Sequence, residues 1–270
     1  MEKLIITLAP TGNVPTKEMT PHVPLTATEI AAAIIDCHAK GAAVAHIHAR
    51  DGQGRPTTES AVFAAIMQLL DTAGCPVIRQ ISTGARGGKP AEARAEALAL
   101  NPDSASLATG SSNFPASANV NEPALVAYMA EIMLQRNIKP EIEVFDTAMI
   151  HNAVLLQKAG LLKPPLLFNL VLGVRGSLPA TAKNLFFLVD SLPAGAVWSV
   201  SVIGPEHVSL SMIAMALGGH VRVGIEDNVY YRKGVLATNA ALVGRMAAIA
   251  AAMGRELATP DDVRRIWGVG

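Results

Sequence analysis

Eight short β-rich runs alternate with eight longer helical patterns along the 270 residues of this chain. The β-rich runs cover Leu4–Leu8, Ala43–His48, Val77–Ser82, Ser104–Leu107, Glu141–Val144, Leu166–Val171, Val197–Val202 and Val221–Ile225. Strands that are connected by helices in this way run parallel to one another. Eight such units close most economically into a (β/α)8 TIM barrel, an α/β fold, and this is the fold that the sequence predicts.

The helical patterns lie between the β-rich runs and one follows the last of them. They cover residues 28–40, 59–73, 90–100, 123–136, 149–159, 182–192, 205–217 and 239–253. Local signals support several of these boundaries. Thr26 and Glu29 have the spacing of a capping box, and Gly41 fits the C-terminal end of the first helix. Pro123 and Pro205 are predicted to lie in the first turns of their helices.

An open, doubly wound sheet is the alternative arrangement of the same units. Its commonest function is dinucleotide binding, which requires a glycine-rich turn after the first strand. Here that turn reads Pro10-Thr11-Gly12-Asn13, which lacks the fingerprint. No linker rich in Pro, Ser and Gly divides the chain, so we expect residues 1–270 to form one catalytic TIM-barrel domain.

The composition argues against several classes of partner. Basic and acidic residues number 22 each and only 4% of residues are aromatic, unlike a basic nucleic-acid-binding surface with stacking aromatics. No apolar run approaches the roughly 18 residues of a membrane span. Cys37 and Cys75 fall in a predicted helix and just before a strand, which is typical of packed, reduced thiols. We therefore expect a cytoplasmic protein that acts on small molecules.

Two histidines stand at the end of the second predicted strand. Alternate residues of a strand share a face about 7 Å apart, so His46 and His48 can reach one ion near the strand end. Two histidines satisfied by backbone and water are the other interpretation. Glu226 follows the eighth strand, which closes against strand one and so lies near strand two. Two histidines, one carboxylate and an open position describe a catalytic zinc site.

Further polar residues follow the carboxyl ends of other predicted strands, where barrel enzymes place their active sites. They include Ser82, Ser106, Glu143, Asn169, Arg222 and Asp227. The charged members fit either an ordinary ion-pair network or a catalytic group. The serines alone indicate little, because the sequence contains no Gly-x-Ser-x-Gly nucleophile elbow.

Several segments in order carry a resemblance to a known family. They are Ala9-Pro-Thr-Gly-Asn-Val-Pro-Thr-Lys17, Thr20-Pro-His-Val-Pro24, His46-Ile-His-Ala-Arg-Asp51, Ser82-Thr-Gly84, residues 105–114, Glu141-Ile-Glu-Val-Phe-Asp146, Val171-Leu-Gly-Val174 and Val221-Arg-Val-Gly-Ile-Glu-Asp-Asn228. Together these segments resemble the β-keto acid cleavage enzymes, and the likeness spans essentially the whole chain.

The resemblance implies a zinc-dependent, oligomeric TIM barrel, expected as a homotetramer. Such an enzyme combines a β-keto acid with acetyl-CoA and releases acetoacetate and a new acyl-CoA. The implied zinc ligands are His46, His48 and Glu226. The implied substrate contacts are Ser82, Ala85 and Ser106, and the implied catalytic polar triad is Glu143, Arg222 and Asp227. Zinc remains the expected ion, with another divalent metal as the alternative.

One position departs from the amine-specific member of that family, which has a glutamate in the first loop to receive the substrate's ammonium group. This chain has Val14 there. A buried ammonium without a partner is costly, so we expect a keto acid without an amino group.

Two other functions remain as alternatives. The first is a metal-dependent hydrolase or aldolase, because His-x-His also opens amidohydrolase sites. Those sites add histidines after strands five and six, where this chain has Glu143 and Asn169. The second alternative is a binding or scaffold protein without activity.

Overall fold

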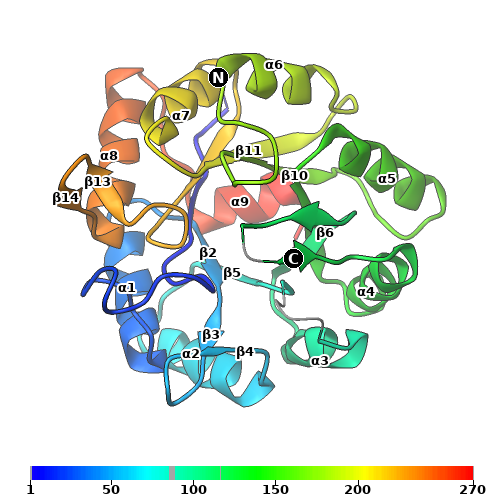
Figure 1. Ribbon diagram of the computed structural model, residues 1–270, viewed down its shortest axis with the longest axis horizontal. Helices are drawn as coiled ribbons and strands as arrows, with labels where there is room; N and C mark the ends of the chain where they lie inside the picture. Colours follow the sequence, from blue (N-terminus) through cyan, green and yellow to red (C-terminus); the bar gives the residue numbers. More distant parts are fainter. Residues whose placement is uncertain (1, 85–88, 116, 270) are drawn as a thin grey trace.

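The structure is a computed structural model that describes residues 2–84, 89–115 and 117–269. Eight parallel strands close into a barrel, viewed along its axis in Figure 1. In order around the barrel they are β1 (Ile6–Leu8), β2 (Val44–Ile47), β5 (Ile78–Ile81), β6 (Ser104–Ala108), β9 (Lys139–Val144), β10 (Leu167–Leu172), β11 (Val197–Val202) and β12 (His220–Val223). The closed barrel confirms the predicted fold, and the open-sheet alternative is wrong.

An outer ring of helices surrounds the barrel (Figure 1). The ring consists of α1 (Ala27–Ala39), α2 (Ser60–Thr72), α3 (Ala91–Ala95), α4 (Pro123–Gln135), α5 (Thr147–Lys158), α6 (Ala182–Asp190), α7 (His207–Ala216) and α8 (Asn239–Ala252). The predicted capping box is present at α1, where Thr26 and Glu29 bond each other's backbone N–H groups. Pro123 is in the first turn of α4, as predicted.

Two predicted helices have different boundaries in the structure. Pro205 is not in the first turn of α7, because a turn in which His207 N–H donates to Gly204 O comes first and Glu206 is the N-cap. The predicted helix at residues 90–100 is split. Its second half, Glu96–Leu100, is a 3₁₀-helix that ends at Asn101 in the left-handed conformation.

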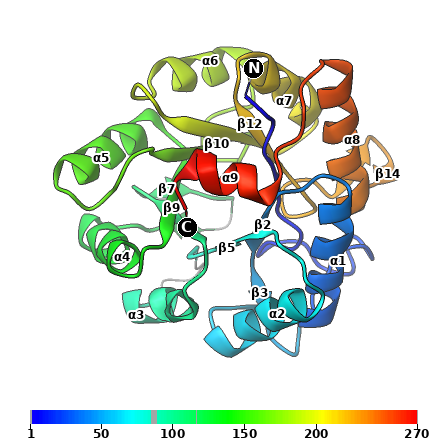
Figure 2. The ribbon, with the colours of Figure 1, turned by 180° about the vertical axis from the view of Figure 1, so that it is seen from behind.

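The sequence pattern missed a ninth helix and three short hairpins. Helix α9 (Pro260–Trp267) lies across the amino-terminal end of the barrel, as Figure 2 shows. Its buried Val263 and Trp267 pack against residues at the starts of the strands, such as Ile5. The hairpins pair β3 (Ala49–Arg50) with β4 (Pro56–Thr57), β7 (Ser112–Asn113) with β8 (Ala118–Asn119), and β13 (Tyr230–Arg232) with β14 (Val235–Leu236).

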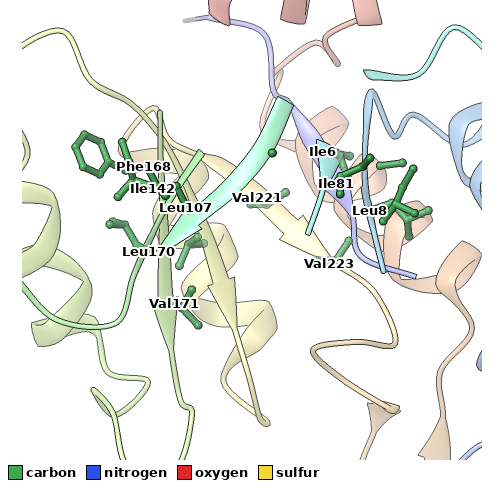
Figure 3. Close-up of a cluster of buried hydrophobic side chains, with 14 of the residues drawn as sticks. Ile6, Leu8, Ile81, Leu107, Ile142, Phe168, Leu170, Val171, Val221 and Val223 are labelled. Carbon is green, nitrogen blue, oxygen red and sulfur yellow. The ribbon is translucent and has the colours of Figure 1, made fainter. Parts of the chain in front are cut away.

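The main hydrophobic core lies between the strands and the surrounding helices. Alternate strand residues point to opposite faces of the sheet, and the apolar set packs against the helices. Examples are Ile6, Leu107, Ile142, Phe168 and Val221, which Figure 3 shows on neighbouring strands. No helix in the described parts of the chain is both long enough and apolar enough to cross a bilayer.

Barrel closure joins the first and last strands. Leu8 pairs with Val223 of β12 on one side and with Ala45 of β2 on the other. The backbones meet closely just beyond this point, because a Cβ on Gly224 would lie 1.9 Å from the carbonyl oxygen of Ala9. This closure carries residues 224–228 to the carboxyl end of β2, as the sequence predicts.

Candidate metal centre and active site

His46, His48 and Glu226 converge at the carboxyl end of the barrel. His46 is in β2, His48 follows it, and Glu226 follows β12. The two Nε2 atoms are 3.3 Å apart. Glu226 Oε1 lies 3.3 Å from His48 Nε2 and 3.9 Å from His46 Nε2. The three ligand atoms, one from each residue, lie within 4.8 Å of one another. They are close enough to surround one cation.

The Nδ1 atoms of both imidazoles, which point away from the candidate metal centre, form hydrogen bonds with side-chain amide oxygens. His46 Nδ1 lies 2.7 Å from Gln80 Oε1, and His48 Nδ1 lies 3.0 Å from Asn13 Oδ1. An amide oxygen only accepts, so each Nδ1 is the donor and each Nε2 keeps its lone pair. Two lone pairs facing each other and a carboxylate fit a bound cation. Glu226 Oε2, which is buried without a hydrogen-bond partner among the described residues, supports the same interpretation.

The protonation states of this group suit metal ligands. Burial, reinforced by the positive charge of Arg222, lowers the pKa of His46 to about 3. Burial on its own would raise the pKa of Glu226, but Arg222 and the two imidazoles outweigh it and hold that pKa well below the ordinary value. A neutral imidazole and an ionised carboxylate are therefore present at neutral pH, as coordination requires.

Gly12 gives the Glu226 side chain the room that it occupies. A Cβ on Gly12 would lie 2.5 Å from Glu226 Cγ, and the backbone of Gly12 has φ +63°. Both facts require glycine here. The buried Arg50 side chain holds this loop in place, since it donates to the carbonyl oxygens of Gly12 and Pro15 at 2.9 and 3.0 Å.

Arg222 joins three carboxylates beside the candidate metal centre. Its Nε and Nη2 donate to the two oxygens of Asp227, each at 3.1 Å. Nη2 also donates to Glu226 Oε1 at 2.5 Å, and Nη1 donates to Glu143 Oε1 at 3.4 Å. The sequence predicts Glu143, Arg222 and Asp227 as a group, and the structure brings them together.

Burial and the surrounding charges act in opposite directions on this network. Burial would lower the pKa of Arg222, but the three carboxylates raise it above the ordinary value, so the guanidinium stays charged. Burial raises the pKa of Asp227 to about 6, against the attraction of Arg222. Burial also raises the pKa of Glu143, again against Arg222. Carboxyl groups with raised pKa values can take up and release protons near neutral pH.

A cavity of about 130 Å³ opens beside these residues. Its polar lining consists of Asn13, His48, Ser82, Asn119, Glu143, Arg222, Glu226 and Asp227. Its apolar lining consists of Val14, Phe114, Phe145, Val171, Val174 and Ile203, together with the backbone of Gly84. The volume holds roughly ten water-sized groups, which suits a short-chain acid.

The three predicted substrate contacts lie in different situations. Ser82 lines the cavity. Ser106 is buried and is not among the described residues that line the cavity, and its Oγ accepts a hydrogen bond from Thr83 N–H at 3.2 Å. Ala85 lies outside the described residues, so its predicted contact stays a prediction.

Comparison with known protein families decides the identity. The family model described as beta-keto acid cleavage enzyme matches residues 3–269. This chain belongs to the β-keto acid cleavage enzyme family. Membership confirms the predicted resemblance and the prediction that the chain is an enzyme of the transferase type that acts on β-keto acids. The scaffold alternative is therefore wrong.

Curated relatives support the family assignment over the full length. A 3-keto-5-aminohexanoate cleavage enzyme from Fusobacterium nucleatum is 41% identical over 268 residues, covering 98% of each chain. A 3-oxoadipate:acetyl-CoA acetyltransferase from Cupriavidus necator is 38% identical over 269 residues, covering 98% of this chain and 94% of the relative. Among solved structures, apo ObcA has a TM-score of 0.81 at 23% identity, covering 93% of this chain and 66% of that one, which supports the fold.

Several residues of this family member's site were missed in the sequence. Gln80 and Asn13 hydrogen-bond the imidazoles, and Phe114, Phe145 and Ile203 form much of the apolar lining. Gln80 pairs with His46 in the register of neighbouring strands, and the sequence pattern does not give that register. The apolar lining comes largely from loops and strand ends, whose spatial order has no periodic signature.

Proposed function

We propose that this chain combines a β-keto acid without an amino group with acetyl-CoA and releases acetoacetate and a new acyl-CoA. His46, His48 and Glu226 would hold zinc or another divalent metal. The observation that carries this proposal is the pair of imidazole nitrogens 3.3 Å apart that faces a carboxylate beside a small cavity. The name of the Cupriavidus necator relative supports acetyl-CoA as the co-substrate.

The remaining predicted residues have roles around the substrate. The Ser82 hydroxyl, which lines the cavity, would donate to the substrate carboxylate. Ser106 would act through the Thr83 backbone that it bonds, and Ala85 stays a proposed contact with the substrate carboxylate. When bound, the metal supplies Lewis-acid stabilisation of negative charge on the substrate oxygens.

Glu143 and Arg222 would remove the C2 proton of the substrate and stabilise the negative charge that this leaves. Glu143 lines the cavity and has a raised pKa, so it would take the C2 proton of the β-keto acid as general base. The fixed positive charge of Arg222 would stabilise the carbanion that results. Arg222 cannot itself be the base, because three carboxylates raise its pKa above an already high value. Asp227 holds the guanidinium in place.

The bonds exchange in two steps. The C2 carbanion attacks the thioester carbonyl of acetyl-CoA, a carbon–carbon bond forms, and CoA leaves as the thiolate. The thiolate then attacks the original keto carbon, the bond between that carbon and C2 breaks, and the new acyl-CoA departs. Glu143 returns the proton to C2, and acetoacetate is released. No proton or electron is gained or lost overall.

A direct assay tests this function. The purified enzyme is incubated with zinc, acetyl-CoA and a panel of short 3-ketoacids, and the acyl-CoA products are identified by mass. We expect acetoacetate and the matching acyl-CoA in equal amounts. Hydrolysis of a panel member without CoA exchange would instead support the metal-dependent hydrolase alternative.

The apolar part of the cavity lining supports a substrate with an uncharged side chain. Val14 and the other apolar residues contribute this part, and the rings of Phe114 and Phe145 meet edge to face with centroids 5.4 Å apart. An ammonium group on the substrate would lose its hydration here without gaining a partner. The name of the Fusobacterium nucleatum relative favours an aminated substrate, but an overall identity of 41% does not determine which residue stands at a single position of the lining.

Substitution of Val14 tests this substrate preference. Wild-type enzyme should turn over unsubstituted 3-ketoacids with a higher kcat/KM than 3-keto-5-aminohexanoate. Val14 lines the cavity and is 46% exposed, so Val14→Glu places a partly exposed carboxylate there. It should shift the ratio of the two kcat/KM values toward the aminated acid by roughly fivefold, since such an ion pair is worth on the order of 1 kcal/mol. Val14→Gln, which adds similar bulk without charge, is the matched control. Preference of the wild type for the aminated acid would contradict the proposal.

The proposal extends to the cellular compartment and the oligomeric state of the protein. We infer one catalytic domain over residues 1–270, located in the cytoplasm as a homotetramer. The free and buried Cys37 and Cys75 support a reducing compartment. Phe186 and Phe187 on α6 are 50% and 58% exposed, which supports contacts between subunits.

A further inference from the structure

Many inward-facing side chains in the middle of this barrel are polar, whereas Val, Ile and Leu usually fill the interior of a (β/α)8 barrel. Apolar residues such as Val44, Ile78 and Leu167 fill only the amino-terminal end, where they pack with α9. Around the level of His46 the interior holds buried hydrogen-bonding groups. They are Thr7, His46, Gln80, Ser104, Glu141, Asn169, Ser199 and His220. Burying so many polar groups is unfavourable unless they bond to one another, so the direction of their hydrogen bonds is informative.

One line of hydrogen bonds leads from the backbone to His46. The Ser104 hydroxyl donates to the carbonyl oxygen of Lys139 at 2.7 Å. That hydroxyl has a single hydrogen, so its oxygen accepts the bond from Gln80 Nε2 at 3.3 Å. Gln80 therefore turns its amide oxygen toward His46 Nδ1, 2.7 Å away. Because the Lys139 carbonyl can only accept, every donor along this line is determined, and Nδ1 carries the proton.

Glu141 is a second polar neighbour of the same amide. Its carboxyl group is buried inside the barrel beside the Gln80 side chain, whose amide acts to lower the pKa of that carboxyl, and its Oε2 has no hydrogen-bond partner among the described residues. Ser104 accepts from the amide NH2 of Gln80, and the neighbouring Glu141 carboxyl favours the orientation that turns this NH2 group, not the amide oxygen, toward it. Burial raises the pKa of Glu141 to about 7. A carboxyl group keeps an acceptor oxygen whether it is ionised or neutral, so the orientation of the Gln80 amide does not depend on that charge.

We propose that Gln80, oriented by Ser104 and Glu141, is a positioning residue that fixes the Nδ1–H tautomer of His46 and directs its Nε2 lone pair to the metal site. This inference rests on the metal role of His46 proposed above. Gln80 and Glu141 are not among the described residues that line the cavity, so they act through His46. Hydrogen bonds of this kind set the orientation and basicity of a ligating histidine.

The first test is the zinc affinity of the metal-free, full-length protein, measured by competition with a chromophoric chelator. Gln80→Met keeps the length of the side chain and removes the amide. We expect the Kd for zinc to rise about 10- to 100-fold. Ser199→Ala is the matched control, because it removes a hydroxyl from the same interior that bonds Asn169 rather than Gln80. It should leave the Kd unchanged.

A double exchange separates positioning from simple packing. Gln80→Glu combined with Glu141→Gln reverses donor and acceptor between the two side chains and still presents an oxygen to His46 Nδ1. This variant should regain most of the zinc affinity that Gln80→Met loses. If Gln80→Met binds zinc as tightly as the wild type, or the double exchange gives no recovery, the positioning role is wrong.

A second measurement does not depend on any substituted protein folding correctly. In wild-type, metal-free protein labelled with ¹⁵N-histidine, the imidazole nitrogen shifts report which nitrogen of His46 carries the proton. We expect a protonated Nδ1 and an unprotonated Nε2, and the reverse would overturn the proposal. If wild-type protein binds no zinc, the metal site itself fails, while the tautomer of His46 still decides the role of Gln80.

Discussion

His46→Ala is expected to abolish tight zinc binding and to lower kcat by on the order of 10³-fold or more, since the metal supplies several kcal/mol of charge stabilisation. The substitution removes one of the two imidazole nitrogens that face Glu226. The remaining ligands, His48 and Glu226, leave the ion with too few protein contacts for a stable tetrahedral site. Metal content by elemental analysis and turnover of a 3-ketoacid with acetyl-CoA are measured on the same sample.

His151→Ala is the matched control for that experiment. His151 is an exposed residue of α5. Its loss should change neither metal content nor kcat. Thermal unfolding of both variants identifies any effect of an altered fold. If His46→Ala without bound metal keeps the wild-type kcat, the metal role of this histidine is refuted.

Arg222→Met should lower kcat by on the order of 10²–10³-fold, which is the usual effect of removing one preorganised charge-stabilising donor. It should also lower the free energy of unfolding by about 3–5 kcal/mol, because buried carboxylates lose their partner. Those carboxylates belong to Asp227, Glu226 and Glu143, which Arg222 contacts in the wild-type protein. Steady-state kinetics and urea unfolding monitored by circular dichroism measure the two effects.

Two further variants separate catalysis from stability. Arg222→Lys keeps a positive charge without the planar fork, so it should regain part of the stability and less of the activity. Arg255→Met removes another buried arginine, whose donors bond carbonyl oxygens such as those of Glu2 and Gly219 near the opposite end of the barrel. It should lower stability while the folded enzyme keeps its kcat. Equal loss of kcat in Arg255→Met and Arg222→Met would contradict a catalytic role for Arg222.

The barrel and the central site residues were predictable from the sequence for a physical reason. Strands and helices of a barrel have strong periodic patterns, and the ligands directly follow apolar runs whose order fixes where they meet. His46, His48 and Glu226 could therefore be grouped although they are far apart in the chain. The same reasoning predicted that Arg222 and Asp227 lie beside these three residues, and the two side chains do contact each other.

The remaining parts depend on details that the sequence pattern does not encode. Gln80 reaches His46 because their two strands align residue for residue, and a shift of one position would turn it away. Ser106 is not among the described residues that line the cavity, and its hydroxyl accepts a hydrogen bond from Thr83 N–H. Helix α9 has only 8 residues, and its apolar contacts are to strand starts that are distant in sequence, so it gave no recognisable pattern.

The pairing of β1 with both β2 and β12 has a consequence for the order of events during synthesis. His46 and His48 leave the ribosome long before Glu226, and nothing holds the carboxylate near the imidazoles until the last strand docks. A cation would gain its third protein ligand only at that moment. A metal bound as proposed above would therefore add its binding free energy to the stability of completed chains and not to that of nascent ones.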